Sequence, residues 1–193
     1  MISRTQITPD DLVLAKEILA ETPVYEYSHR QEQANEVGVL GEVIARRWLK
    51  SSGVHFTPTN TTQHDLRMVE GGRTIDVKTK DRTVPPRMDY EASVPLYNHD
   101  HQRPDYYLFI SLYRDRTNKS ADISRFETAY VVGAIGQNKL NSIGIRRERD
   151  EVDQRNGTQF WTSCLNVYHR DLVPPEVASK VWREMSPYVD GWT

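Results

Sequence analysis

The sequence predicts an α/β fold in which helices flank a central mixed β-sheet. Two segments, 9–22 and 35–50, carry apolar side chains at helical spacing. Others alternate apolar and polar side chains with the two-residue period of a strand. These strand-like segments are 54–59, 65–69 and 74–80. The most apolar run, 105–113, is expected to be a buried central strand, because a strand covered on both faces loses that alternation.

The two predicted helices have recognisable ends. Thr8-Pro9-Asp10-Asp11 supplies a hydroxyl cap, a proline at the first helical position and acids in the first turn. Thr22-Pro23 ends this helix, since proline cannot continue one. The second helix carries one apolar stripe and has Gly53 as its predicted terminator. The stripe consists of Val37, Leu40, Val43, Ile44 and Trp48.

Glycines and prolines divide the rest of the chain. Glu70-Gly71-Gly72-Arg73 separates two strand-like segments and predicts a β-hairpin. Downstream, 129–135 and 160–168 are expected to be strands, and 137–158 a polar loop or short helix. Residues 176–185 are expected to form a last helix.

A chain of 193 residues has the size of one domain. We expect a core at about 35–136, preceded by the helix 9–22 and followed by a C-terminal extension, 137–193. The segment 81–104 contains four prolines and is interpreted as a loop insertion.

The composition excludes several classes of protein. No apolar run approaches the ~18 residues that cross a bilayer, so no membrane partner is expected. The N-terminal residues lack the apolar core of a signal peptide. Cys164 is the single cysteine, which excludes an intrachain disulfide and a multi-cysteine zinc site. We therefore expect an intracellular, cytoplasmic protein in which Cys164 is a small buried hydrophobe. The formal charge of −2 argues mildly against a protein that grips polyanions over its whole surface.

The most informative pattern is Asp65, ten intervening residues, and then Asp76-Val77-Lys78. A hairpin that turns symmetrically about Gly71-Gly72 places Asp65 opposite Lys78. It also places Arg67 opposite Asp76. Because side chains alternate along strands, these charged residues share one face and the apolar residues between them share the other. A one-residue slip would mix the two sets, so the partition supports the pairing.

In this register Asp65 and Asp76 are diagonal neighbours, with Cβ atoms roughly 7–8 Å apart. Two carboxylates at that separation can hold one hard cation, and Mg²⁺ prefers oxygen ligands. Lys78 points its ammonium at the same place, where it can position a water and offset charge that develops on a phosphate. We expect Mg²⁺ as the cofactor and Mn²⁺ as a substitute for it.

This arrangement resembles the PD-(D/E)XK nuclease superfamily, in which one strand carries an acid and the next an acid-any-lysine triplet. Members also carry a glutamate on the preceding helix, and Gly41-Glu42 matches that element. The resemblance covers roughly 35–136 and implies a restriction-endonuclease-like core. The tail, with 130–135 and 165–174, is similar to stand-alone members often encoded by phages and mobile elements. The chain departs from the pattern in having His64 in place of proline, and proline-rich sequence in place of the helix after the lysine strand.

The resemblance also implies roles. The implied metal ligands are Asp65, Asp76 and the Val77 carbonyl. Lys78 would position the attacking water, and Glu42 would hold a second metal ion or a water. Glu36, on the same helix, is the nearest rival of Glu42. Water would attack phosphorus in line, and the metal would stabilise the departing 3′-oxygen.

Further residues are candidates for substrate contact. Lys80 shares the strand face of Lys78 and is either a phosphate contact or an exposed lysine, while Arg67 either pairs with Asp76 or touches substrate. Gln102 superficially resembles the Gln-x-x-x-Tyr motif of RecB-like nucleases, although Pro104 disfavours the helix that this motif needs.

The insertion adds side chains that could stack on bases or contact phosphates, or could serve ordinary loop packing. They are Arg87, Tyr90, Tyr97 and Arg103. His99 and His101 lack a matched third ligand and are expected to be polar loop residues, not a zinc site.

The sequence therefore predicts a Mg²⁺-dependent deoxyribonuclease, a metal-dependent enzyme that hydrolyses phosphodiester bonds in DNA. It does not distinguish an exonuclease from an endonuclease or a junction resolvase. The alternative is a catalytically silent module of the same fold that binds nucleic acid or inhibits a partner. Retention of Glu42, Asp65, Asp76 and Lys78 together favours the enzyme. DNA is the expected partner, a homo-oligomer is left open, and nothing in the sequence indicates a partner protein.

Overall fold

The structure is a computed structural model that describes residues 1–21, 31–59, 63–96, 102–154, 157 and 159–185. For 31–35 it describes only the helical backbone. The predictions made for Tyr97, His99 and His101 lie outside the described residues.

A six-stranded sheet forms the centre of the molecule, with strand order β1-β7-β6-β4-β3-β2. Its strands are β1 (Ser3–Gln6), β2 (Phe56–Pro58), β3 (Leu66–Met68), β4 (Thr74–Arg82), β6 (Tyr106–Tyr113) and β7 (Thr128–Gly136). The β4–β6 pair is parallel and the other described neighbours are antiparallel, so the sheet is mixed as predicted. The segment 105–113 is confirmed as a central strand, and β6 is buried on both faces from Tyr106 to Leu112.

One face of this sheet is covered by α2 (Gln31–Ser51), with α1 (Pro9–Glu21) and α4 (Pro175–Glu184) also on that side. Both N-terminal helices confirm the predicted segments, and α2 begins a turn earlier than expected. Trp182 of α4 packs edge-on against Trp48 of α2, with ring centroids 6.5 Å apart, and also contacts Tyr106. This face holds the larger apolar core.

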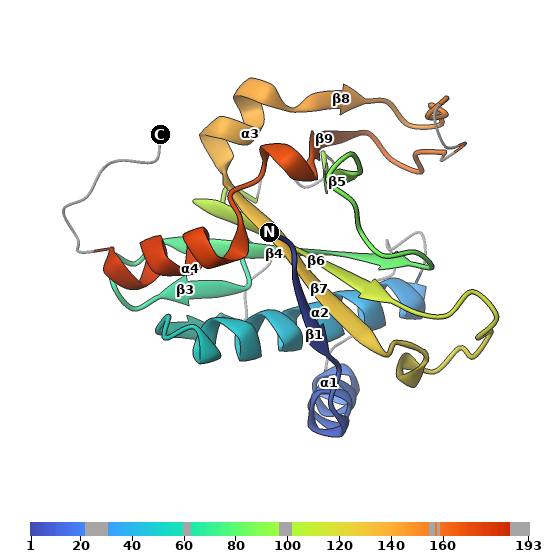
Figure 1. The fold of residues 1–193 in the computed structure, drawn as a ribbon, viewed down its shortest axis with the longest axis horizontal. Coiled ribbons are helices and arrows are strands. Elements are labelled where there is room, and N and C mark those ends of the chain that lie inside the picture. The colour runs from blue at the N-terminus through green and yellow to red at the C-terminus, as the bar shows by residue number, and fades with distance from the viewer. Residues whose placement is uncertain (22–30, 60–62, 97–101, 155–156, 158, 186–193) are drawn as a thin grey trace.

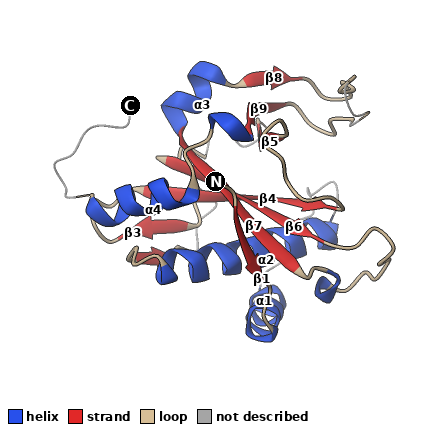
Figure 2. Ribbon diagram, viewed as in Figure 1, coloured by secondary structure: helices blue, strands red, loops and turns tan. Residues whose placement is uncertain are grey.

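The opposite face is covered by a small sheet of order β5-β9-β8 and by α3 (Gln137–Ile143). The small strands are β5 (Glu91–Pro95), β8 (Ile145–Arg147) and β9 (Cys164–Tyr168). Figures 1 and 2 show this layer, with α3, on the side of the central sheet away from α1 and α2. A second apolar cluster, which includes Tyr107, Phe109 and Val132, lies beneath it.

Three expectations are corrected. Segment 81–104 is not only a loop, because it contains β5, which pairs with β9 in the C-terminal part of the chain. Likewise 137–158 contains β8 as well as α3. The strand β1, which pairs with β7, has no counterpart among the predicted elements.

The hairpin is confirmed, but its predicted register is wrong by two residues. Leu66 pairs with Ile75 and Arg67 with Thr74, so Asp65 comes next to Asp76 and not to Lys78. The turn closes where Met68 N donates to Arg73 O at 2.8 Å, and Gly71 and Gly72 both have positive φ. A shift of two residues keeps every side chain on its predicted face, so the separation of charged and apolar sets survives the correction.

None of the helices in the described ranges combines the length and the apolar composition needed to cross a membrane.

Candidate active site

The predicted site lies where β3 leaves the edge of β4. Among described residues, β3 pairs with β4 only at Thr74 and Ile75. Beyond that point the Asp65 side chain replaces a backbone partner of β4: its Oδ2 accepts a hydrogen bond from Val77 N at 2.6 Å. The backbone N–H and C=O of one strand residue point to the same edge, so the Val77 carbonyl is also directed toward the Asp65 side. The hairpin thus fixes the Asp65 carboxylate beside the middle of β4.

Asp76 and Lys78 project from β4 toward the face that the small sheet covers. In the pairing of β4 with β6, Asp76 lies beside Tyr107 and Lys78 beside Phe109. Both of these β6 residues belong to the apolar cluster on that face. Asp76 is only 2% exposed, and its Oδ2 lies 2.7 Å from Lys78 Nζ. Lys78 also donates to Gln102 Oε1 at 3.2 Å. The lysine is therefore held between a buried carboxylate and a side-chain amide.

Glu42 reaches this region from α2, on the other side of the sheet. A Cβ on Gly41 would clash with the Thr79 side chain, so α2 approaches β4 more closely than any other residue type would allow at this position. Glu42 pairs with Arg46 at 3.0 Å and interacts electrostatically with Asp65 and Asp76. Its rival Glu36 instead forms an ion pair with Arg125 at 3.1 Å.

The electrostatics of these carboxylates are unusual. Burial, and then the charges of Asp76 and Glu42, raise the pKa of Asp65 to about 8, against the opposing effects of the Val77 N–H and Lys78. Burial also raises the pKa of Asp76, although Lys78 opposes that rise. The pKa of Glu42 is raised by burial and by Asp76, while Arg46 and Lys78 act in the other direction. Three acids thus lie in a partly desolvated region with too little positive charge to ionise all of them easily.

A divalent cation suits this deficit of positive charge, and the donor set is made of oxygen atoms, as Mg²⁺ prefers. The described residues contain no three His, Cys, Asp or Glu side chains already spaced to hold one ion. The contacts explain why: Asp76 is turned toward Lys78, Glu42 toward Arg46, and Asp65 toward the Val77 N–H. The residues fit a cation by chemistry and charge, and binding would require Asp76 to exchange its lysine contact for the ion.

The structure places the other candidate residues at varying distances from this site. Gln102 contacts Lys78, and Lys80 lies two residues further along the same face of β4. Arg67 does not pair with Asp76: its Nη1 donates to Gly72 O at 3.1 Å in the turn. Arg87 forms an exposed ion pair with Asp89 at 3.1 Å. Cys164 is confirmed as buried, and burial raises the pKa of its thiol to about 11.

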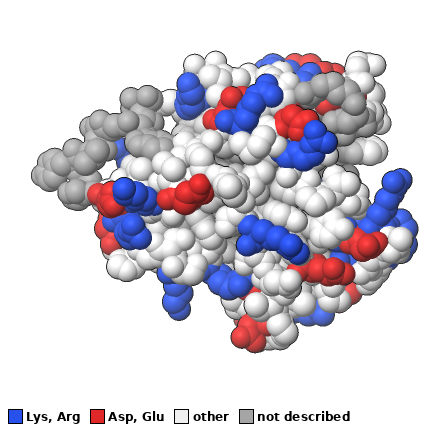
Figure 3. Space-filling view, viewed as in Figure 1, with Lys and Arg blue, Asp and Glu red and all other residues white. Residues whose placement is uncertain are grey.

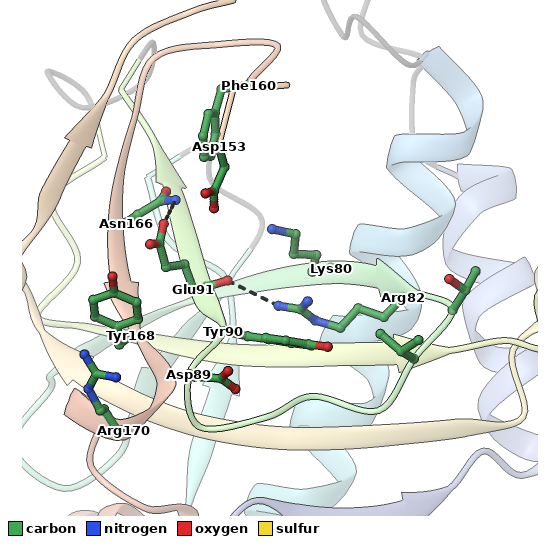
Figure 4. A pocket seen from close by; sticks show the side chains of 12 residues that line it. Lys80, Arg82, Asp89, Tyr90, Glu91, Asp153, Phe160, Asn166, Tyr168 and Arg170 are labelled. Carbon is green, nitrogen blue, oxygen red and sulfur yellow. Dashed lines mark hydrogen bonds between the residues drawn. The ribbon is translucent and has the colours of Figure 1, made fainter. Parts of the chain in front are cut away.

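Two adjoining cavities, of about 660 and 370 Å³, lie between β4 and the small sheet and share Lys80, Arg82 and Phe160. The smaller one also includes Lys78 in its lining. Figure 4 shows Lys80 extending from β4 into the larger cavity, with Tyr90 on one side and Phe160 and Asp153 on another. Phe160 and Trp161, which line these cavities, are not among the residues predicted for the site. The signal available was a pair of aromatic residues in an otherwise polar segment before a strand.

Comparison with known proteins adds no relative: no protein-family model matches the chain, and no curated protein matches it.

Proposed function

We propose that this protein is a Mg²⁺-dependent deoxyribonuclease with a restriction-endonuclease-like core, similar to the PD-(D/E)XK superfamily. The observation that carries the proposal is the meeting of Asp65, Asp76 and Lys78 where β3 leaves β4. Support also comes from Glu42, which a close helix–sheet contact brings into their electrostatic range.

In this proposal Asp65, Asp76 and the Val77 carbonyl hold Mg²⁺. The ion, when bound, polarises the scissile phosphate and stabilises the negative charge on the departing 3′-oxygen. The raised pKa of Asp65 means that the carboxylate loses its proton when the cation binds, because the ligand is the ionised form.

The protein's own side chains then orient the attacking water. Lys78, released from Asp76, holds the water for in-line attack and offsets negative charge on the phosphate oxygens. Gln102 accepts a hydrogen bond from Lys78 and acts as a positioning residue for its ammonium. Glu42 accepts a hydrogen bond from the water or holds a second cation. We assign the reaction to DNA in the cytoplasm, with Mn²⁺ able to replace Mg²⁺.

The test is a cleavage assay with Mg²⁺ on linear, circular, single-stranded and branched DNA, comparing the wild type with Asp76→Ala and Lys78→Ala. Loss of either group is expected to slow cleavage by about 100-fold or more. Lys139→Ala, an exposed lysine of α3, is the matched control and should cleave at the wild-type rate. Circular dichroism and thermal melting check that each variant is folded.

Wild-type rates in Asp76→Ala or Lys78→Ala would refute the assignment. If neither cleavage nor DNA binding responds to Mg²⁺ or Mn²⁺, the protein is instead a catalytically silent module.

A further inference from the structure

A cleft runs from Lys78 along one face of β4, between the central sheet and the small sheet. We call it the β4 cleft and define it by the two adjoining cavities of about 660 and 370 Å³. Lys78 belongs both to its lining and to the proposed active site. The smaller cavity therefore adjoins the proposed active site through Lys78.

The floor of the β4 cleft is basic. Lys78, Lys80 and Arg82 alternate along β4 and share one face, so their successive Cα atoms are about 6.6 Å apart. Arg82 is fixed by hydrogen bonds to Ser111 Oγ and Glu91 O, each at 3.2 Å. A row of cations on a rigid strand suits a ligand whose negative charges repeat along its length.

Acidic residues that border the cleft are largely balanced by other groups. Glu91 forms an ion pair with Arg147 at 3.2 Å. It also accepts a hydrogen bond from Asn166 at 2.7 Å, which Figure 4 shows. Asp89, which lines the larger cavity, forms an exposed ion pair with Arg87 at 3.1 Å.

Asp153 also lines the larger cavity, and Asp76 pairs with Lys78 at 2.7 Å. The positive charge of the floor therefore comes mainly from Lys80 and Arg82.

The walls are aromatic. The guanidinium carbon of Arg82 lies over the Tyr90 ring, 5.1 Å from the ring centroid. Phe160 borders both cavities. Trp161, next to Phe160, lines the smaller cavity and is 63% exposed. Exposing a large apolar side chain to water is unfavourable, and such exposure is typical of a binding surface. Basic residues that follow a backbone, combined with aromatic rings beside them, are the features with which proteins bind unpaired nucleic acid.

The dimensions favour one strand over two. Both cavities fall within the range of about 300–1,000 Å³ that is typical of pockets for small ligands. A double helix, whose major groove alone is about 12 Å wide, cannot enter a space of that size between two packed sheets.

We propose that the β4 cleft binds an unpaired DNA strand, with phosphates on Lys80 and Arg82 and a base stacked on Trp161. This inference rests on the proposed nuclease function for one of its consequences. If that function holds, the substrate class is DNA with a single-stranded segment next to the scissile phosphate.

The test measures binding without cleavage, by fluorescence anisotropy in EDTA. The probes are a fluorescein-labelled oligodeoxynucleotide as a single strand and as a blunt duplex of the same sequence. The single strand is expected to bind the wild type at least about tenfold more tightly than the duplex. Trp161→Ala should weaken single-strand binding about tenfold through loss of stacking. Lys80→Gln should reduce the slope of log K against log salt by about 0.7, the value for one phosphate contact.

Matched controls are Val13→Ala, an exposed apolar residue of α1, and Lys139→Gln on α3, and both should bind as the wild type does. Equal binding of the two probes, or no effect of Trp161→Ala and Lys80→Gln in folded variants, would overturn the proposal. So would full displacement of the strand by an equal concentration of deoxythymidine monophosphate, because the site would then take a nucleotide.

The outcome is separable from that of the cleavage assay. Single-strand binding through these residues without Mg²⁺-dependent cleavage would leave the cleft assignment standing and refute the nuclease. Cleavage of blunt duplex without single-strand binding would support the nuclease and refute the cleft assignment.

Discussion

At the scale of single residues, the feature with the clearest consequence is the carboxyl group of Asp65. Its pKa is raised to about 8 by burial and by two neighbouring acids, whereas a free aspartate titrates near 3.8. Burying this carboxyl group among other acids lowers the stability of the folded protein. Strongly shifted pKa values of this kind are typical of residues at functional sites.

A pH dependence follows for the metal-free protein. Between about pH 4 and 8 the unfolded chain has lost the Asp65 proton and the folded chain has kept it, so stability falls as pH rises through this window. Asp65→Asn should reduce the loss of unfolding free energy between pH 5 and pH 8. Urea denaturation in EDTA at the two pH values measures it. Glu17→Gln, an exposed acid on α1, is the control.

The same titration predicts that Mg²⁺ raises the unfolding midpoint of the wild type more at pH 8 than at pH 6, because the proton competes with the ion. Identical pH profiles for the wild type and Asp65→Asn would contradict both expectations.

At the scale of elements, the contact between α2 and β4 decides where Glu42 lies. Gly41 allows this approach, since a Cβ at this position would overlap Thr79 Oγ1 and lie 2.6 and 2.7 Å from Thr79 Cγ2 and Cβ. Gly38 lies about one turn earlier on the same helix and has no atom within 4 Å of the equivalent position. The two glycines therefore provide a matched pair for testing the contact.

Gly41→Ala should destabilise the fold by about 1–3 kcal/mol, because the added methyl forces α2 away from β4. It should also slow cleavage by displacing Glu42. Gly38→Ala should instead stabilise the protein by up to about 1 kcal/mol, the gain from replacing glycine within a helix. Urea denaturation measures both.

Thr79→Ala in the Gly41→Ala background should restore part of the stability. It removes two of the three close atoms, and the Thr79 hydroxyl makes no hydrogen bond within the described residues. If Gly41→Ala were as stable as Gly38→Ala, the close approach would not control the position of α2.

At the scale of the whole molecule, the net charge of −2 combines with a local basic site. On the face shown in Figure 3, basic and acidic side chains of the described residues are interspersed and form no extended patch of one sign. In the proposed binding mode, contact with DNA depends on the few basic side chains of the β4 cleft.

The expected slope of log K against log salt for a single strand is about −1.4, from the two proposed phosphate contacts of Lys80 and Arg82 at about −0.7 each. Binding titrations at several KCl concentrations measure it. A slope steeper than about −5 would show that many more phosphates are contacted and that the local description is wrong.

The sequence alone determined the elements whose signals are local. Helical spacing with capping residues located α1 and α2, and an unbroken apolar run located β6. Strand alternation also placed Asp76 and Lys78 on one face, and this survived the two-residue error in register because the side-chain period is two.

Only the tertiary structure decided the remainder, because it depends on contacts between distant parts of the chain. β5 is stabilised by pairing with β9, more than sixty residues later, and has little local signal. The choice of Glu42 over Glu36 depends on the packing of Gly41 against Thr79 and on the ion pair of Glu36 with Arg125. The β4 cleft exists only when the small sheet covers the central one, and periodicity within a segment carries no information about that contact.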